Sequence, residues 1–173
     1  EVERFAWTKS FRRVLNRGDR DLEARWGPPR VDSPRIELFA KHRLTRGLSH
    51  GDDEVTADSY RGFLIESCGD TLEWSTYHDG GLVGVSIMDV GAESVSAVYT
   101  FFDPDYSRYS PGTYAVLSQI RWAAAHGRRY VYLGMYVASN RHLNYKARFG
   151  PQQRFIDGHW IDIDEAILRE PRK

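Results

Sequence analysis

The sequence has few of the features that mark secreted, membrane-spanning or metal-dependent proteins. Cys68 is the only cysteine among 173 residues, so no internal disulfide forms, and we expect a small buried residue in a reducing, cytoplasmic setting. No apolar run approaches the roughly 20 residues of a membrane span, and the charged first residues are unlike a signal peptide. The six histidines show no metal-ligand spacing, and neither a Walker loop nor a Gly-x-Ser-x-Gly elbow occurs. We therefore expect one globular domain over residues 1–173, with no bound metal and no membrane partner.

Charge is balanced over the whole chain, with 24 basic and 24 acidic residues, but it is unevenly distributed. The net charge is +5 for residues 1–50, −11 for 51–107, +8 for 108–154 and −2 for the last 19 residues. Residues 108–154 contain no carboxylate at all. Such a segment is typical of a site for a phosphate-bearing partner. The alternative is that the acidic and basic segments face each other across the fold.

Hydrophobic periodicity and turn residues predict a mixed α/β (α+β) chain after a basic extension of residues 1–20. Strands are expected over residues 21–26, 72–78, 82–88, 95–102 and 130–133. Helices are expected from the caps Ser33 and Thr56, from the cap Ser110 to Gly127 and, in a shorter form, after Ser139. A last hairpin should turn at Asp157-Gly158. The order is β-α-α-β-β-β-α-β-α-β-β, with one helix connecting two parallel strands of a mixed sheet. This order resembles the fold of the Gcn5-related N-acetyltransferases (GNAT).

In that superfamily the start of the central helix binds a phosphate-bearing acyl carrier, and here that helix starts near Ser110. Free amides and the helix dipole favour an anion there, Gly112 permits close approach of the backbone, and Arg108 lies just before it. The coenzyme A loop of the superfamily reads roughly Arg-x-x-Gly-x-Gly/Ala, whereas this chain reads Arg108-Tyr-Ser-Pro-Gly-Thr-Tyr. Because the spacing differs by one and the bulky Tyr114 replaces a small residue, a coenzyme A acyltransferase is the least favoured enzyme.

Longer motifs resemble the C-terminal domain of the arginyl-tRNA–protein transferase family, and within it the bacterial aspartate/glutamate leucyltransferases. The motifs are Ser96-Ala97-Val98-Tyr99-Thr100-Phe101-Phe102-Asp103-Pro104, Gly112-Thr113-Tyr114-Ala115, Tyr130-Val131-Tyr132-Leu133-Gly134, Asn144-Tyr145-Lys146-Ala147-Arg148-Phe149 and Asp157-Gly158-His159-Trp160. The likeness is clear over about residues 56–161 and weaker from Phe11 onward.

The resemblance implies an aminoacyltransferase of an N-degron pathway. Such an enzyme joins the amino acid of an aminoacyl-tRNA, of leucine or arginine type, to the α-amine of an acceptor. The acceptor is most often a protein or peptide N-terminus bearing Asp or Glu. The donor is the tRNA 3′ end, and no cofactor is implied.

The chain departs from the family pattern in two places that bear on the acceptor. Family members usually carry an N-terminal region with clustered cysteines, which this sequence lacks. After Gly134 a lysine and a cysteine of the family pattern are replaced by Ala138 and Asn140. Two alternatives therefore stand beside a protein acceptor. One is tRNA-dependent aminoacylation of a small molecule or peptide natural product, and the other is a non-catalytic tRNA-binding module.

Two residues are candidates for catalysis. Asp103 is expected to draw in the ammonium and accept its proton, the alternative being an Asx turn with Pro104. Lys146 is expected to bind tRNA phosphates or the tetrahedral oxyanion, the alternative being a solvated helix face.

A larger set of residues is expected to bind the two substrates. The candidates for aminoacyl-tRNA binding are Arg108, Ser110, Gly112, Thr113, Tyr114, Arg141 and Arg148. The candidates for the substrate pocket are Tyr99, Tyr132, Tyr136, Asn144 and Tyr145. The tyrosines at positions 99, 132 and 136 would stack on the terminal adenine or line the amino-acid pocket, with plain core packing as the alternative.

Overall fold

The computed structural model describes residues 1–48, 54–67 and 69–163, so the expectation for Cys68 lies outside the described residues. The helices are α1 Lys9–Asp21, α2 Ser33–Thr45, α3 Ala57–Leu64 and α4 Pro111–Ala125, with the 3₁₀ helices η1 Pro104–Tyr109 and η2 Asn144–Arg148. The strands are β1 Glu23–Gly27, β2 Asp70–His78, β3 Gly81–Val90, β4 Ser94–Phe102, β5 Tyr130–Tyr132, β6 Gln152–Ile156 and β7 His159–Ile163. No helix within these ranges has the length and apolar character needed to cross a bilayer.

Five strands form one mixed sheet in the order β1-β2-β3-β4-β5. The first four are antiparallel neighbours, and α4 connects β4 to the parallel strand β5, which confirms the expected crossover. Strand β5 pairs with β4 only over Ser94–Ser96, so in the described chain residues 97–102 have no strand beside them on that edge. The hairpin β6–β7 forms a separate sheet of two strands.

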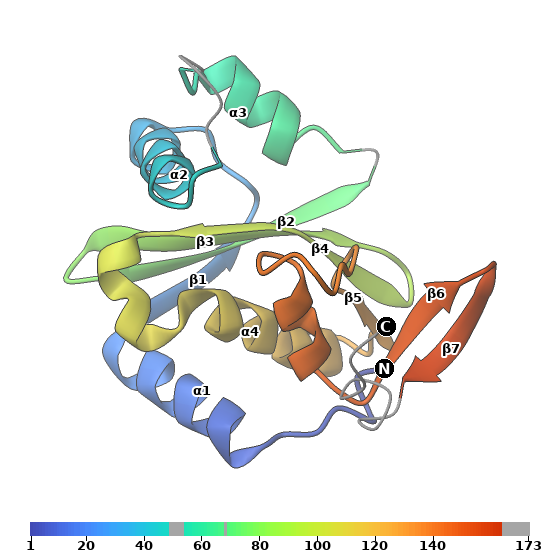
Figure 1. The fold of residues 1–173 in the computed structure, drawn as a ribbon. Coiled ribbons are helices and arrows are strands. Elements are labelled where there is room, and N and C mark those ends of the chain that lie inside the picture. Colours follow the sequence, from blue (N-terminus) through green and yellow to red (C-terminus); the bar gives the residue numbers. More distant parts are fainter. Residues whose placement is uncertain (49–53, 68, 164–173) are drawn as a thin grey trace.

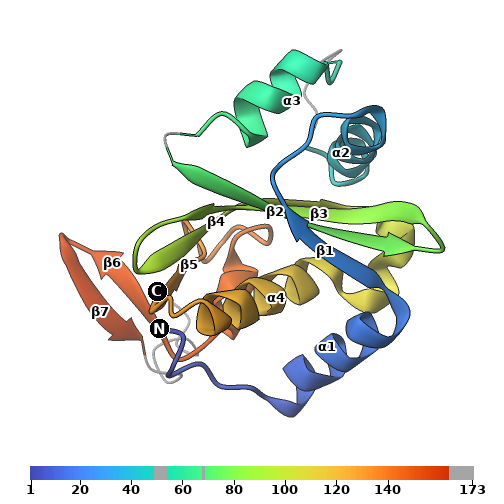
Figure 2. The ribbon, with the colours of Figure 1, turned by 180° about the vertical axis from the view of Figure 1, so that it is seen from behind.

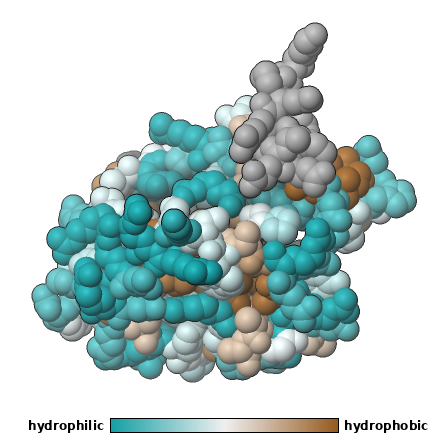
Figure 3. Space-filling model, turned by 90° about the horizontal axis from the view of Figure 1, so that it is seen from below, coloured by the Kyte–Doolittle hydropathy of each residue, from teal (hydrophilic) through white to brown (hydrophobic). Residues whose placement is uncertain are grey.

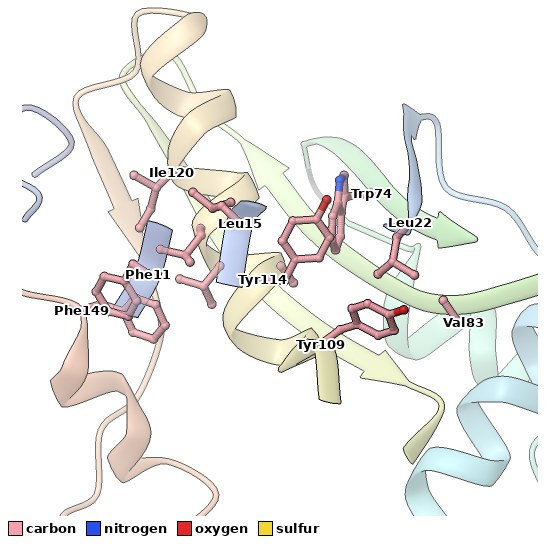
Figure 4. Close-up of a cluster of buried hydrophobic side chains, with 12 residues drawn as sticks. Phe11, Leu15, Leu22, Trp74, Val83, Tyr109, Tyr114, Ile120 and Phe149 are labelled. Carbon is pink, nitrogen blue, oxygen red and sulfur yellow. The ribbon is translucent and has the colours of Figure 1, made fainter. Parts of the chain in front are cut away.

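Helices cover both faces of the five-stranded sheet. Figures 1 and 2 show α2 and α3 over one face, α4 over the other, and α1 below α4. On the first face the core is built from Phe39, Tyr60 and Phe101 with their neighbours. On the second face a cluster joins α1, α4 and β2, and Figure 4 shows Leu15 and Tyr114 within it. Apolar side chains buried on both faces fix the layer order.

Helix α1 was not expected, because residues 1–20 were treated as a basic extension. Thr8 caps the helix, its Oγ1 accepting from the amide of Phe11 at 3.2 Å. Phe11, Leu15 and Gly18 recur at helical spacing and are buried against α4. A Cβ on Gly18 would lie 2.5 Å from Cζ of Tyr114, so the close contact between the two helices requires a glycine.

Three local expectations are corrected at element ends. The cap of α2 is Asp32 in place of Ser33, with its Oδ1 accepting from the amide of Arg35 at 3.1 Å. Ser110 precedes α4 as expected but is left-handed (φ 52°) and makes no side-chain capping bond. The short helix expected after Ser139 is the 3₁₀ helix η2, which starts at Asn144.

Two other end signals are confirmed. Thr56 and Ser59 form a reciprocal capping box at the start of α3. Asp157 (φ 48°) and Gly158 (φ 82°) both have positive φ, as a type I′ turn between β6 and β7 requires.

Candidate functional site

A groove with a volume of about 1610 Å³ lies between β5, the segment after it and the β6–β7 hairpin. Its lining comes from residues 130–139, from β6, from Trp160 and Ile163 of β7, and from Glu1, Val2 and Phe5 near the N-terminus. Of the predicted site residues, the groove brings together Tyr132, Tyr136 and Lys146. We call it the β5 groove.

Lys146 is the cation best placed in the β5 groove. Its Nζ donates to the carbonyl of Met135 at 2.8 Å and lies 3.5 Å from the position that a Cβ would take on Gly134. Gly134 has φ 77°, a conformation that side chains rarely adopt, so the loop passes the ammonium group as bare backbone. Burial lowers the pKa of Lys146, and no carboxylate within the described chain forms an ion pair with it. The ammonium is thus held by one carbonyl and is able to take an anionic oxygen as a second partner.

Arg154 on β6 is a second groove cation, and the sequence reasoning assigned it no site. Its guanidinium lies 3.6 Å from the ring centroid of Tyr136, and its Nε donates to Oε1 of Gln152 at 3.2 Å. One of its terminal nitrogens, Nη2, is buried without a hydrogen-bond partner in the described residues. The signal that could have found it is its position, the last of the eight basic residues in the segment without carboxylates.

Gln152 connects the groove wall to η2. Its side-chain amide donates to the carbonyls of Lys146 and Phe149, both at 3.1 Å. The side chain of Gln152 also accepts from Nε of Arg154. Gln152, at the start of β6, therefore bonds to the backbone of one groove cation and to the side chain of the other.

Exposed aromatic side chains line the outer part of the groove. Tyr132 lies 5.6 Å from Trp160, and Trp160 lies 5.2 Å from Phe155, measured between ring centroids. The exposed fractions are 39% for Tyr132, 52% for Trp160 and 61% for Phe155, too large for core residues. Trp160 and Phe155 were missed as site residues, although their places on either side of the Asp157-Gly158 turn were visible in the sequence. Such rings can accept stacked nucleotide bases.

The start of α4 is a second location, outside the lining of the β5 groove. Arg108 and Ser110 are exposed there, and Gly112 and Thr113 are half-buried. The guanidinium of Arg108 lies over the ring of Tyr109 at 4.8 Å, and its Nη2 donates to the Tyr109 hydroxyl at 3.1 Å. The predicted donor-binding residues are therefore divided between two places.

Tyr114 and Tyr99, both predicted to contact a substrate, are turned toward packed helices. Tyr114 is 1% exposed, and its hydroxyl donates to Oδ1 of Asp19 at 2.8 Å. Burial and the neighbouring Asp19 carboxylate raise the pKa of Tyr114. Tyr99 lies edge-on to Phe39 and Phe63, on the sheet face covered by α2 and α3. For Tyr99, which is partly buried against the cluster of α2 and α3, core packing was the stated alternative and fits these contacts.

Asp103 forms the Asx turn that was the alternative to a catalytic role. Its Oδ1 accepts from the amide of Asp105 at 3.0 Å and from Nζ of Lys41 at 2.7 Å. Burial of the carboxylate raises its pKa, but the hydrogen bonds from Lys41 and the Asp105 amide outweigh this, and the pKa lies below its usual value. A role as proton acceptor stays a prediction.

Helix α2 also contacts the backbone of Phe102, the last residue of β4, through the side chain of His42. Nδ1 of His42 lies 3.0 Å from the carbonyl oxygen and 3.2 Å from the amide nitrogen of Phe102, and the tautomer of the ring decides whether it donates to the first or accepts from the second. Burial lowers the pKa of His42, which favours the neutral ring. Lys41 and His42 together fix the end of β4.

The remaining predicted residues lie between β5 and β6, outside the lining of the groove. Arg141 and Arg148 are exposed, as expected for backbone-phosphate contacts. Asn144 donates to the carbonyl of Ala138 at 3.3 Å, which places it in a loop-stabilising position. Tyr145 is 38% exposed and packs edge-on against Phe149.

Ion pairs distinguish the two interpretations of the charge pattern. Of the eight basic residues in 108–154, two pair with carboxylates in the described part: Arg121 with Asp19 and Arg129 with Glu93. Of these two carboxylates, Glu93 belongs to the acidic segment. Other carboxylates of that segment pair with Lys41 and Arg35, which lie in residues 1–50. Among the residues that the structure describes, the acidic and basic segments therefore face each other at one pair, and six of the eight basic side chains form no ion pair.

The mixed sheet, the crossover helix and the covering helices define a GNAT-like fold. The comparison with solved structures supports this fold. L-PGS from Bacillus licheniformis superposes with a TM-score of 0.58 at 12% identity, over 82% of this chain and 45% of that one. The PaiA N-acetyltransferase from Thermoplasma acidophilum, solved with coenzyme A, superposes with a TM-score of 0.57 at 12% identity, over 80% of this chain and 95% of that one. At such identities the likeness establishes the fold alone.

The sequence comparisons identify the family within that fold. Residues 34–156 match the family model described as arginine-tRNA-protein transferase, C terminus. The aspartate/glutamate leucyltransferase of Stenotrophomonas maltophilia (strain R551-3) is 34% identical over 172 residues, covering 96% of this chain and 68% of that protein. The chain belongs to the arginine-tRNA-protein transferase family, as its motifs indicated, and it is a transferase.

Proposed function

We propose that this protein transfers an amino acid from aminoacyl-tRNA to the α-amine of an acceptor, with the reaction in the β5 groove. The observation that carries the proposal is Lys146, a partly buried ammonium group without a carboxylate partner in the described chain, beside exposed aromatic rings. Cations and stacking surfaces together suit a single-stranded nucleic acid end that carries an ester. No cofactor is required, because the donor is already an activated ester.

The reaction needs positioning more than acid–base chemistry. The neutral α-amine attacks the ester carbonyl, the C–N bond forms, and the C–O bond to the tRNA 3′ oxygen breaks. The proton lost by nitrogen goes to the leaving 3′ oxygen, directly or through water. An α-amino group titrates near pH 7.7–8.0, so a useful fraction is neutral at physiological pH. Holding ester and amine at attack distance supplies about 7–11 kcal/mol. Lys146 then stabilises the oxyanion of the tetrahedral intermediate.

The two groove cations support an acidic acceptor. Lys146 is assigned to the oxyanion, and Arg154, held over Tyr136, is left for the side-chain carboxylate of an N-terminal Asp or Glu. Leucine is the first donor amino acid to test, because the Stenotrophomonas relative is named a leucyltransferase. Arginine is the second, from the name of the family.

The test is transfer by the purified protein from leucyl-tRNA and arginyl-tRNA to peptides that begin with Asp, Glu or Ala, followed by mass spectrometry. We expect addition to the acidic peptides. Lys146→Met should lower the rate about 10²–10³-fold, the usual loss for one oxyanion donor, and Lys146→Arg should recover part of it. Arg61→Met on α3, over the opposite sheet face, is the matched control and should keep full activity.

Two outcomes would replace the proposal. Transfer to small amines but to none of the peptides would favour a biosynthetic acceptor. Absence of transfer from every aminoacyl-tRNA to every amine, with tRNA still bound, would reduce the chain to a binding module.

A further inference from the structure

The outer face of α1 is a continuous row of basic side chains. Lys9, Arg12, Arg13, Arg17 and Arg20 are all exposed, and their spacing of three, four and eight residues places them on one side of the helix. We call this row the basic stripe. It spans about 17 Å at 1.5 Å per residue. Figure 3, which views the molecule from the side where α1 lies, shows a largely hydrophilic surface.

Within the described ranges of the chain, most of the stripe has no acidic partner. Arg20 pairs with Asp21, and Arg17 donates to the carbonyl of Arg108. Within the described residues the side chains of Lys9, Arg12 and Arg13 form no hydrogen bond or ion pair. Three basic groups in a row without acidic partners favour an extended anion.

Asp19, the other acidic residue of α1, is engaged by α4 and not by the stripe. Asp19 pairs with Arg121 of α4 at 2.6 Å and accepts from the hydroxyl of Tyr114 at 2.8 Å. The carboxylate of Asp19 is therefore engaged in contacts between α1 and α4.

The two ends of the stripe lead to the two candidate locations of the donor. Phe11, next to the Lys9 end, is stacked on Phe149 of the β5 groove with ring centroids 5.2 Å apart. At the other end Arg17 is bonded to Arg108, directly before α4. A partner lying on the stripe would thus reach the groove at one end and the start of α4 at the other.

We infer that the basic stripe binds the phosphate backbone of the acceptor stem of the tRNA whose 3′ end enters the β5 groove. The inference rests on the proposed function and adds a second contact surface, on a helix outside the groove. Arginine and lysine side chains in a row match the regular phosphates of a duplex and read no sequence. The stripe therefore supplies affinity for any tRNA, and the groove supplies the chemistry.

An anionic lipid surface would also attract a basic helix, but the packing of α1 argues against it. A helix that lies on a membrane inserts its apolar face between the lipids. Here that face is occupied, because Phe11 and Leu15 are 4% and 7% exposed and belong to the core with α4. The basic stripe therefore presents charge but no free apolar face that could insert into a bilayer, and such a surface suits an RNA backbone.

The test separates the stem from the 3′ end by using two leucine donors. One is full leucyl-tRNA, and the other is leucyl-adenosine, which has the ester but no stem. In Arg12→Gln/Arg13→Gln we expect the KM for leucyl-tRNA to rise about 25-fold near 0.15 M salt, about 5-fold for each lost phosphate contact. The KM for leucyl-adenosine should not change. The logarithmic salt slope of the Kd for uncharged tRNA should become shallower by about 2.

The control variant is Arg30→Gln/Arg61→Gln, which removes two exposed charges near α2 and on α3. It should leave all three measurements unchanged. The inference is overturned if the stripe variant keeps the wild-type KM for leucyl-tRNA, or if it loses both donors equally. If the wild-type protein transfers an amino acid from no aminoacyl-tRNA, the proposed function fails. The salt slope for uncharged tRNA still decides the stripe in that case, and an unchanged slope with weakened binding to anionic vesicles would assign the surface to lipid.

Discussion

Glu73→Gln is expected to be the most destabilising single substitution among the ion pairs of this protein. Glu73 lies on β2 and is 2% exposed. Its Oε1 accepts from Nη2 of Arg35 at 2.5 Å, and its Oε2 accepts from Nε of Arg35 at 3.0 Å and from the amide of Arg30 at 3.2 Å. Burial lowers the pKa of the Arg35 guanidinium, but the bonds from Glu73 and Asp32 more than offset this and raise it. The pair fastens α2 to the sheet.

Removing the charge of Glu73 leaves Arg35 buried, with the partly exposed Asp32 as its remaining carboxylate partner. Breaking a buried pair in this way costs about 3–5 kcal/mol. For a domain of this size 1 kcal/mol corresponds to about 2–4 °C in Tm, so we expect Tm to fall by about 6–20 °C. Differential scanning calorimetry measures the shift.

Glu93→Gln is the matched control, because Glu93 pairs with Arg129 at 3.4 Å while both side chains are about two-thirds exposed. An exposed pair contributes at most about 1 kcal/mol, so its Tm should fall by no more than about 4 °C. Equal shifts for the two variants would refute the reasoning. Arg35→Met/Glu73→Leu, which leaves no unpaired charge inside, should be more stable than Glu73→Gln alone.

Three smaller changes test other contacts. Gly18→Ala should cost about 1–3 kcal/mol in urea unfolding because its Cβ would overlap the ring of Tyr114, and a neutral result would show that the helices can separate freely. Lys41→Met should raise the pKa of Asp103 in an NMR titration. In the wild type this carboxylate stabilises the fold above its unfolded pKa of about 3.9, and the contribution is lost as the pH falls through the lower folded pKa. The variant should lose less stability on acidification, whereas an unchanged Asp103 pKa would rule out the ion pair. Trp160→Ala should raise the KM for leucyl-adenosine about 5–150-fold, since base stacking contributes about 1–3 kcal/mol, and a wild-type KM would remove Trp160 from the donor site.

Most elements were predictable because their signals are local. The Thr56 cap and the Asp157-Gly158 turn each act within a few residues, and both are confirmed. Helix α1 carries an equally local pattern, with Phe11 and Leu15 four residues apart, but its many arginines suggested a solvated extension. The stripe and the core face are two sides of one amphipathic helix, which a count of charges alone does not show.

The candidate site was less predictable because side-chain direction depends on distant neighbours. Tyr114 was placed on the donor because it follows the helix start, yet Asp19, 95 positions earlier, holds its hydroxyl. Asp103 is held by Lys41, 62 positions earlier. Lys146 was chosen from a motif, and the groove around it became visible only with the hairpin in place.

The separate sheet of β6 and β7 means that one wall of the groove is built independently of the core. Five residue pairs join the two strands, and their register is set by their own turn. One more cross-strand pair would raise the wall by about 3.4 Å without changing any strand of the main sheet. The hairpin is therefore the part of the fold where a change in length can reshape the groove while the main sheet stays constant.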